Sequence, residues 1–234
     1  TCAQIGLVFF AHRMLLLDAD SRYADVMERC LYNSVASGVS LDGRRFFYVN
    51  PMAVCPEAAE RSPIHDHVRI VRPEWYGCAC CPPNVARLLA SLGSYAYSVG
   101  RNEVYVHLYA QGGAEVSVGG NAVAIAQKTA YPWQGKVRIT VRPAQPVAFT
   151  LALRIPGWCR GARLAVNGRR VALGPITRKG YARIARTWKR GDRVDLDMPM
   201  PVERVEARPD VRMDCGRVAL QRGPVVFCLE QADN

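Results

Sequence analysis

The sequence has 234 residues and half of them are hydrophobic, so the chain can bury a sizeable core and is not expected to be disordered. Its formal net charge of +11 raises the question of nucleic-acid binding. The basic residues between positions 160 and 186 alternate with apolar residues, as solvent-facing strand positions do, and no nucleic-acid-binding motif surrounds them. We therefore expect a solvated basic surface and no nucleic-acid partner.

The segment Ile5–Leu17 is apolar, but His12 and Arg13 interrupt it. It is also shorter than the roughly 20 residues that span a bilayer. The segment therefore predicts a buried helix, and we expect no membrane partner. No signal-peptide pattern is visible near Thr1, and we expect a cytoplasmic location.

Apolar residues at helical spacing predict helices in the first 97 residues. Asp20 or Ser21 is the expected N-cap of the second helix, and Gly38 is its expected stop. A long irregular stretch, 41–81, precedes the third helix, and loops of such length are usually functional. The predicted helices cover residues 3–17, 21–37 and 83–93.

From about residue 99 the apolar residues alternate with a period of two, which predicts strands. Asn167–Gly168 has the composition of a two-residue hairpin turn. Many short strands without intervening helices predict an antiparallel β-sandwich. The expected fold class is α+β, with a helical domain over residues 1–97 and a β-sandwich domain over 98–234. The predicted strands cover residues 104–109, 136–141, 147–155, 163–166, 193–198 and 218–220.

Nine cysteines are present, and their uneven spacing favours metal binding or a reducing compartment over a disulfide framework. Cys80 and Cys81 come just before the third predicted helix, whose N-terminal dipole stabilises a thiolate. Pro82 and Pro83 stiffen that turn. The residues leave three alternatives open: a metal site, a catalytic or redox cysteine without metal, and an inert cluster. Cys2 is the expected partner thiol in the helical half.

Five segments of the chain form a recognisable set: Glu28–Asn33, Ser40–Gly43, Phe46–Pro51, Glu74–Arg87 and Gly216–Glu230. Together they resemble glycoside hydrolase family 127, the β-L-arabinofuranosidase family. The resemblance covers most of the chain, and its Cys-Cys-Pro-Pro-Asn run is specific. It implies a helical-hairpin (α/α) barrel followed by β-sandwich domains.

The resemblance also implies a catalytic zinc ion held by one glutamate and three cysteines. Thr1-Cys2-Ala3 resembles the end of the family's Glu-Thr-Cys-Ala motif, which makes Cys2 a ligand together with Cys80 and Cys81. The glutamate ligand would precede Thr1, and the acid/base glutamate would lie further upstream. We therefore expect this chain to be the C-terminal portion of a longer enzyme, carrying a remnant of the barrel and inactive by itself.

Cys80 is the implied nucleophile of a retaining hydrolysis that releases β-L-arabinofuranose. Tyr48 resembles the family tyrosine of the sugar subsite, although a core tyrosine would give the same pattern. Glu28 is a candidate for substrate binding or for supporting the ligands, and a surface glutamate is the simpler interpretation. Trp75 is a candidate for stacking on a sugar, a use that aromatic rings share with ordinary packing. The expected partners are L-arabinofuranosides and, in a homodimer, a second copy of the chain.

Two other classes of function remain open at this point. One is a carbohydrate-binding or structural β-sandwich protein with an inactive barrel remnant, which would bind no stoichiometric metal. The other is a thiol redox protein with a disulfide from Cys78 to Cys80 or Cys81. The strand-rich half lacks the βαβ pattern that usually accompanies a redox motif.

Overall fold

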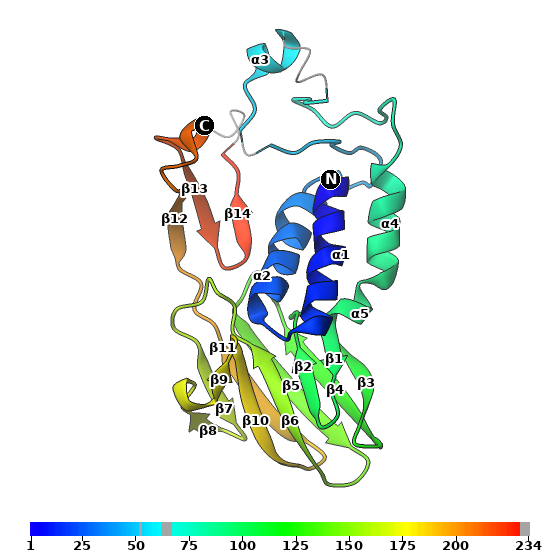
Figure 1. Ribbon diagram of the computed structural model, residues 1–234, viewed down its shortest axis with the longest axis vertical. Coiled ribbons are helices and arrows are strands. Elements are labelled where there is room, and N and C mark those ends of the chain that lie inside the picture. The colour runs from blue at the N-terminus through cyan, green and yellow to red at the C-terminus, as the bar shows by residue number, and fades with distance from the viewer. Residues whose placement is uncertain (52, 62–66, 230–234) are drawn as a thin grey trace.

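The computed structural model describes residues 1–51, 53–61 and 67–229, so Glu230, the last residue of the Gly216–Glu230 motif, lies outside it. Three helices, α1, α2 and α4, stand beside one another above a β-sandwich, and the loop that carries α3 lies beyond their far ends (Figure 1). The helical segments are α1 Cys2–Leu17, α2 Ser21–Cys30, the π-helix η1 Leu31–Val35, α3 Pro56–Arg61, α4 Cys81–Ser91 and α5 Gly93–Ala96.

The first helix buries one face against its neighbours. Ile5, Val8, Ala11 and Leu15 recur at intervals of three or four residues, which places them on the same side of α1. They share a core with residues of α2 and α4, among them Met27. This small helical core orients the N-terminal end of α1 beside that of α4.

The second helix begins as predicted and ends differently. The Asp20 side chain accepts a hydrogen bond from the backbone N–H of Arg22 at 3.0 Å, as an N-cap does. After Cys30 the helix widens into the π-helix η1 instead of continuing to residue 37. Asn33 in η1 donates to the carbonyl of Pro224 and accepts from the N–H of Val226, which joins this turn to the last strand.

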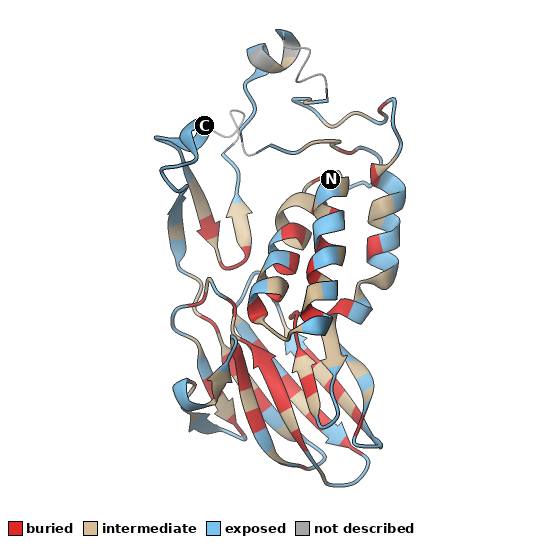
Figure 2. Ribbon diagram, in the orientation of Figure 1, coloured by how far each residue is buried: buried red, intermediate tan, exposed pale blue. Residues whose placement is uncertain are grey.

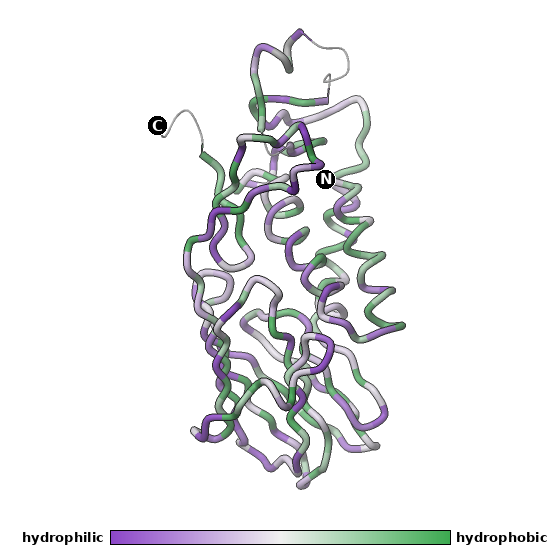
Figure 3. Tube along the Cα trace, turned by 60° about the vertical axis from the view of Figure 1, so that its left-hand side comes forward, coloured by the Kyte–Doolittle hydropathy of each residue, from purple (hydrophilic) through white to green (hydrophobic). Residues whose placement is uncertain are grey.

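The sandwich consists of two sheets whose inner faces form one apolar core, and buried residues line the inward side of its strands (Figure 2). Hydrophobic and hydrophilic residues follow one another along these strands (Figure 3), as the period of two requires. The first sheet has the order β1 Tyr97–Val99, β2 Glu103–Val106, β6 Val147–Arg154, β10 Tyr181–Trp188, β9 Thr177–Arg178. The second has the order β3 Gly112–Val118, β4 Asn121–Thr129, β5 Lys136–Pro143, β11 Asp192–Asp197, β7 Arg163–Val166, β8 Arg169–Val171.

One strand pair departs from the antiparallel prediction. β2 and β6 pair in parallel, because the chain leaves β2, builds β3, β4 and β5 in the other sheet and returns in the same direction. The other pairs of named strands are antiparallel. The predicted hairpin is present: Asn167 and Gly168 connect β7 to β8 with φ values of 49° and 80°, which a type I′ turn requires.

A third sheet follows the sandwich. It has the order β12 Val202–Glu206, β13 Val218–Arg222, β14 Val225–Phe227, and it lies beside the helices (Figure 1). Pro199 and Pro201 separate it from β11, and because proline has no N–H to donate, pairing in the sandwich stops there. The switch from helices to strands falls at Tyr97, while the domain division at residue 98 stays a prediction. Within the described residues, none of the helices combines the length and apolarity needed to cross a bilayer.

Candidate metal and active centre

The cysteine turn opens the helix α4. Cys80 is its N-cap and Cys81 its first residue, so the helix begins two residues earlier than predicted. Pro82 and Pro83 occupy the first turn, where the backbone N–H groups would have no partner inside the helix. Both sulfurs are therefore attached to a rigid backbone at the positive end of a helix dipole, which favours the thiolate form.

Cys2, the first residue of α1, joins this turn. Its Sγ atom lies 3.0 Å from the Sγ atom of Cys80 and 3.7 Å from that of Cys81, and the latter two sulfurs are 3.8 Å apart. The three atoms all lie within 4.8 Å of one another. The convergence predicted for Cys2, Cys80 and Cys81 is therefore confirmed, although nearly 80 positions separate the first from the others.

The three sulfurs match the donor set of a zinc site. Tetrahedral zinc–sulfur bonds of about 2.3 Å place two sulfurs about 3.8 Å apart, and two of the three separations have this value or 0.1 Å less. The third separation, 3.0 Å, is shorter than a tetrahedral edge. The three cysteines leave a fourth tetrahedral position, which the glutamate expected upstream of Thr1 would take. These residues therefore fit a thiophilic metal ion.

The sulfurs do not ionise alike when no cation is bound. Burial opposes ionisation of Cys2, but its hydrogen bonds with Cys80, Asn84 and Cys81 outweigh burial and lower the pKa of Cys2. The hydrogen bond with Cys2, followed by burial, raises the pKa of Cys80 to about 12. Burial, followed by the hydrogen bond with Cys2, raises the pKa of Cys81. Deprotonation of all three thiols would therefore be favoured by a bound cation.

An aromatic wall covers one side of the cluster. Phe46 and Tyr76 are buried with Cys81, and Tyr48 packs against the same group. The rings of Tyr48 and Tyr76 are 5.6 Å apart. The negative charge of Cys80 is the main reason that the pKa of Tyr48 is raised, so the phenol lies close to that sulfur. The structure therefore brings the predicted residue Tyr48 to the cysteines.

Backbone contacts hold Tyr48 in place. The backbone nitrogen of Thr1 donates to the carbonyl of Tyr48 at 2.7 Å, and the Thr1 hydroxyl donates to the carbonyl of Phe47 at 2.7 Å. Gly38 lies beneath this contact, and a Cβ atom there would lie 2.9 Å from the Thr1 hydroxyl oxygen. The irregular stretch 41–81 is thus fastened to the start of α1, next to Cys2.

Tyr76 carries an unusual hydroxyl group. The residue is 8% exposed, and its hydroxyl oxygen has no hydrogen-bond partner among the described residues. Buried polar groups without partners are rare in folded proteins. The position beside Cys81 is therefore one where a bound oxygen-containing group can complete the hydrogen bonding.

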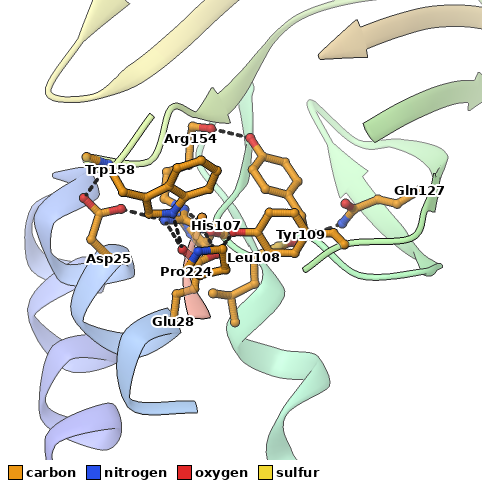
Figure 4. A network of polar contacts seen from close by, with 12 residues as sticks. Asp25, Glu28, His107, Leu108, Tyr109, Gln127, Arg154, Trp158 and Pro224 are labelled. Atoms are coloured by element: carbon orange, nitrogen blue, oxygen red, sulfur yellow. Dashed lines mark hydrogen bonds and ion pairs between the residues drawn. The ribbon is translucent and has the colours of Figure 1, made fainter. Parts of the chain in front are cut away.

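Glu28 lies in a different environment from the cysteines. Its side chain is 2% exposed and pairs with Arg154, while Trp158 Nε1 donates to it at 3.2 Å and the Tyr131 hydroxyl also donates to it (Figure 4). Asp25 accepts a second bond from Arg154 at 2.6 Å. The Glu28 carboxylate is thus engaged by the sandwich, and its expected role in substrate binding stays a prediction.

Trp75 precedes Tyr76 in the sequence, but it is not buried with it. It is 65% exposed, so its ring is available to a ligand. Among the described residues, no hydrogen bond or ring contact joins Trp75 to the three sulfurs, and its role in sugar binding also stays a prediction.

Asn84 and Arg154 were not singled out from the sequence. The Asn84 amide nitrogen lies 3.2 Å from the Sγ atom of Cys2. Asn84 could have been predicted, because it lies three residues after Cys81 and four after Cys80, on the same face of the helix. For Arg154 no local signal existed, because its partners Asp25 and Glu28 lie more than 120 positions away.

Three family descriptions match successive parts of the chain. The catalytic domain of family 127, described as β-L-arabinofuranosidase, matches residues 1–94. The middle domain of the same family matches residues 103–200, and its C-terminal domain matches residues 202–234.

Individual proteins agree with these matches. A non-reducing end β-L-arabinofuranosidase from Bifidobacterium longum is 39% identical over the whole chain, which covers 36% of that protein. The crystal structure of a family 127 β-L-arabinofuranosidase from Geobacillus stearothermophilus superposes with a TM-score of 0.96 at 55% identity, over 100% of this chain and 36% of that one. Another solved structure, a family 127 β-arabinofuranosidase, gives a TM-score of 0.89 at 41% identity, over 100% of this chain and 37% of that one. The chain thus spans a little over a third of the length of these relatives.

Proposed function

Because the chain belongs to glycoside hydrolase family 127, we propose that it supplies the thiol part of the active centre of a retaining β-L-arabinofuranosidase. The observation that carries this proposal is the meeting of Cys2, Cys80 and Cys81 at the ends of two helices. A structural core has no need of three adjacent sulfurs, two of them on a rigid turn. The relatives named as β-L-arabinofuranosidases support the substrate class.

Cys80 is the proposed nucleophile. Its sulfur lies at the N-cap of α4 and is partly exposed, whereas Cys81 is 1% exposed and packed under Phe46 and Tyr76. The Cys80 sulfur attacks the anomeric carbon, and the glycosidic oxygen leaves with a proton from an acid outside this chain. Water then gives a proton to the residue that acted as the acid and attacks the same carbon, and the Cys80 thiolate leaves. Two displacements at one carbon retain its configuration.

Cys2 and Cys81 are the proposed ligands that stay in place during the reaction, with Cys80 as the third. A bound zinc ion would keep sulfur deprotonated at neutral pH and would ease the departure of the thiolate in the second step. Tyr48 lines the proposed sugar subsite, since its phenol lies near Cys80. Trp75, which is exposed, offers a ring for stacking against a sugar face.

The proposal is tested in the full-length protein with a nitrophenyl β-L-arabinofuranoside and a metal determination. We expect one zinc per protein. Cys80→Ser should lower turnover by at least about 10³-fold at any zinc concentration, because a serine hydroxyl is a weaker nucleophile and a poorer leaving group.

Cys81→Ser is the matched variant, one position along the same turn. It should weaken zinc binding and recover part of its activity in excess zinc, because oxygen is a poor but usable ligand. Equal rescue of both variants by zinc, or a wild-type protein without bound metal, would contradict the proposal.

A further inference from the structure

Asn84 links the two helices that carry the cysteines. It lies in the first turn of α4, four residues after Cys80 and three after Cys81. Its side-chain amide donates a hydrogen bond to the Sγ atom of Cys2 on α1, at 3.2 Å. The contact therefore joins the start of one helix to the start of the other.

The Asn84 amide contacts one of the three cysteine side chains, that of Cys2. Cys81 is enclosed by apolar rings, and Cys80 lies beside the Tyr48 phenol, whereas the amide donor contacts Cys2. An N–H group directed at a sulfur fixes the direction of its lone pairs and withdraws charge from it. A sulfur so held keeps its place when a neighbouring ligand moves.

We propose that Asn84 is a positioning residue that fixes Cys2 as a permanent metal ligand, leaving Cys80 as the thiolate free to react. This inference rests on the proposed function. Its chemistry is that of the outer contacts of a metal site, which orient a ligand and tune its charge without binding the metal themselves. Ordinary helix capping does not account for the contact, because the amide donates away from its own helix.

The experiment uses the full-length protein with cobalt(II) in place of zinc, since cobalt–thiolate bonds give charge-transfer absorption in the near ultraviolet. Asn84→Leu keeps a similar volume and removes the donor. We expect its charge-transfer band to move to longer wavelength, because a sulfur without the hydrogen bond gives up charge more readily. Zinc affinity, measured by competition with a chromophoric chelator, should fall about 10- to 100-fold.

Two controls separate positioning from general stability. Asn50→Leu makes the same replacement at an exposed asparagine whose amide donates to Ser37 at 2.6 Å, and it should leave band and affinity unchanged. Asn84→Leu added to Cys2→Ala should cause no further change, because the acceptor that the amide contacts is already gone. Asn84→Ala, which suits a helix, should reproduce the band shift if Asn84→Leu folds poorly.

The possible results are distinct. An unchanged band and affinity in Asn84→Leu and Asn84→Ala would overturn this inference alone. A loss of thermal stability without a band shift would do the same, since it would show a merely structural residue. If the unsubstituted protein gives no cobalt–thiolate band, the proposed metal centre is wrong, and this inference fails with it.

Discussion

Cys2, Cys80 and Cys81 have the same side chain and three different surroundings. Cys81 is buried, Cys2 is held by an amide, and Cys80 caps a helix beside a phenol. Their meeting could not be predicted from spacing, because 78 residues separate Cys2 from Cys80. The family resemblance supplied it. Asn84 could have been found from the helical period alone.

His107 illustrates how burial sets the charge of a single residue. It is 1% exposed, with Nδ1 at 2.7 Å from the Tyr181 hydroxyl and Nε2 at 2.8 Å from the Ser98 hydroxyl. Burial, with the positive charge of Arg154 as a smaller cause, lowers its pKa from 6.5 to about 3. The imidazole is therefore neutral in the folded protein at any pH above this value.

This pKa predicts a loss of stability in mild acid. Between pH 6.5 and about 3 the unfolded chain binds a proton at His107 that the folded chain does not, so stability falls as pH falls through this window. At pH 5 the loss from this residue is about 2 kcal/mol. His107→Gln should remove it. Urea unfolding of both chains at pH 7 and pH 5 checks this, and equal losses in the two chains would refute it.

Helix ends and turns that are determined by neighbouring residues could be predicted from the sequence. Features that depend on contacts between residues far apart in the chain could not. The Asn167–Gly168 turn and the Asp20 cap follow from neighbouring residues. Asn33 in the π-helix η1 bonds to Val226 of β14, 193 positions away, and the parallel β2–β6 pair depends on the path of three intervening strands. Neither leaves a local pattern.

The hairpin turn gives a prediction at this scale. Gly168 has a φ of 80°, in the left-handed region where a Cβ atom costs about 1–2 kcal/mol. Gly168→Ala should lower the free energy of unfolding by about 1 kcal/mol. Gly174→Ala is the matched control, since a Cβ atom there meets nothing within 4 Å and its φ is not positive. Urea unfolding compares the two, and equal effects would contradict this account of the turn.

At the scale of the molecule, a buried ion network joins the helices to the sandwich. Arg154, at the end of β6, is fully buried and pairs with Asp25 and Glu28 of α2 (Figure 4). Its Nε donates to the carbonyl of His107 at 2.6 Å, and its own carbonyl accepts from the Tyr109 hydroxyl. The switch from helices to strands could be predicted from the sequence. The ion network could not, because the charged residues that form it are far apart in the chain.

Replacing Arg154 should weaken the contact between the helices and the sandwich and lower the free energy of unfolding. Arg154→Met leaves two carboxylates without their cation in a buried place, which costs about 3–5 kcal/mol. Arg138→Met is the control, because Arg138 is half exposed in its pair with Asp195 and such pairs contribute about 0–1 kcal/mol. Chemical unfolding of the chain measures both. A loss for Arg154→Met no larger than that for Arg138→Met would show that the network does not hold the two parts together.

The central claim, that Cys80 is the nucleophile of a thiol centre, is tested most directly by finding the sulfur that reacts. The full-length protein is treated with a cysteine-directed arabinofuranose epoxide or haloacetamide, and its peptides are sequenced by tandem mass spectrometry. We predict one label per protein on Cys80, prevented by excess L-arabinose and absent from Cys80→Ser. A label confined to Cys81 or to Cys2 would contradict the assignment.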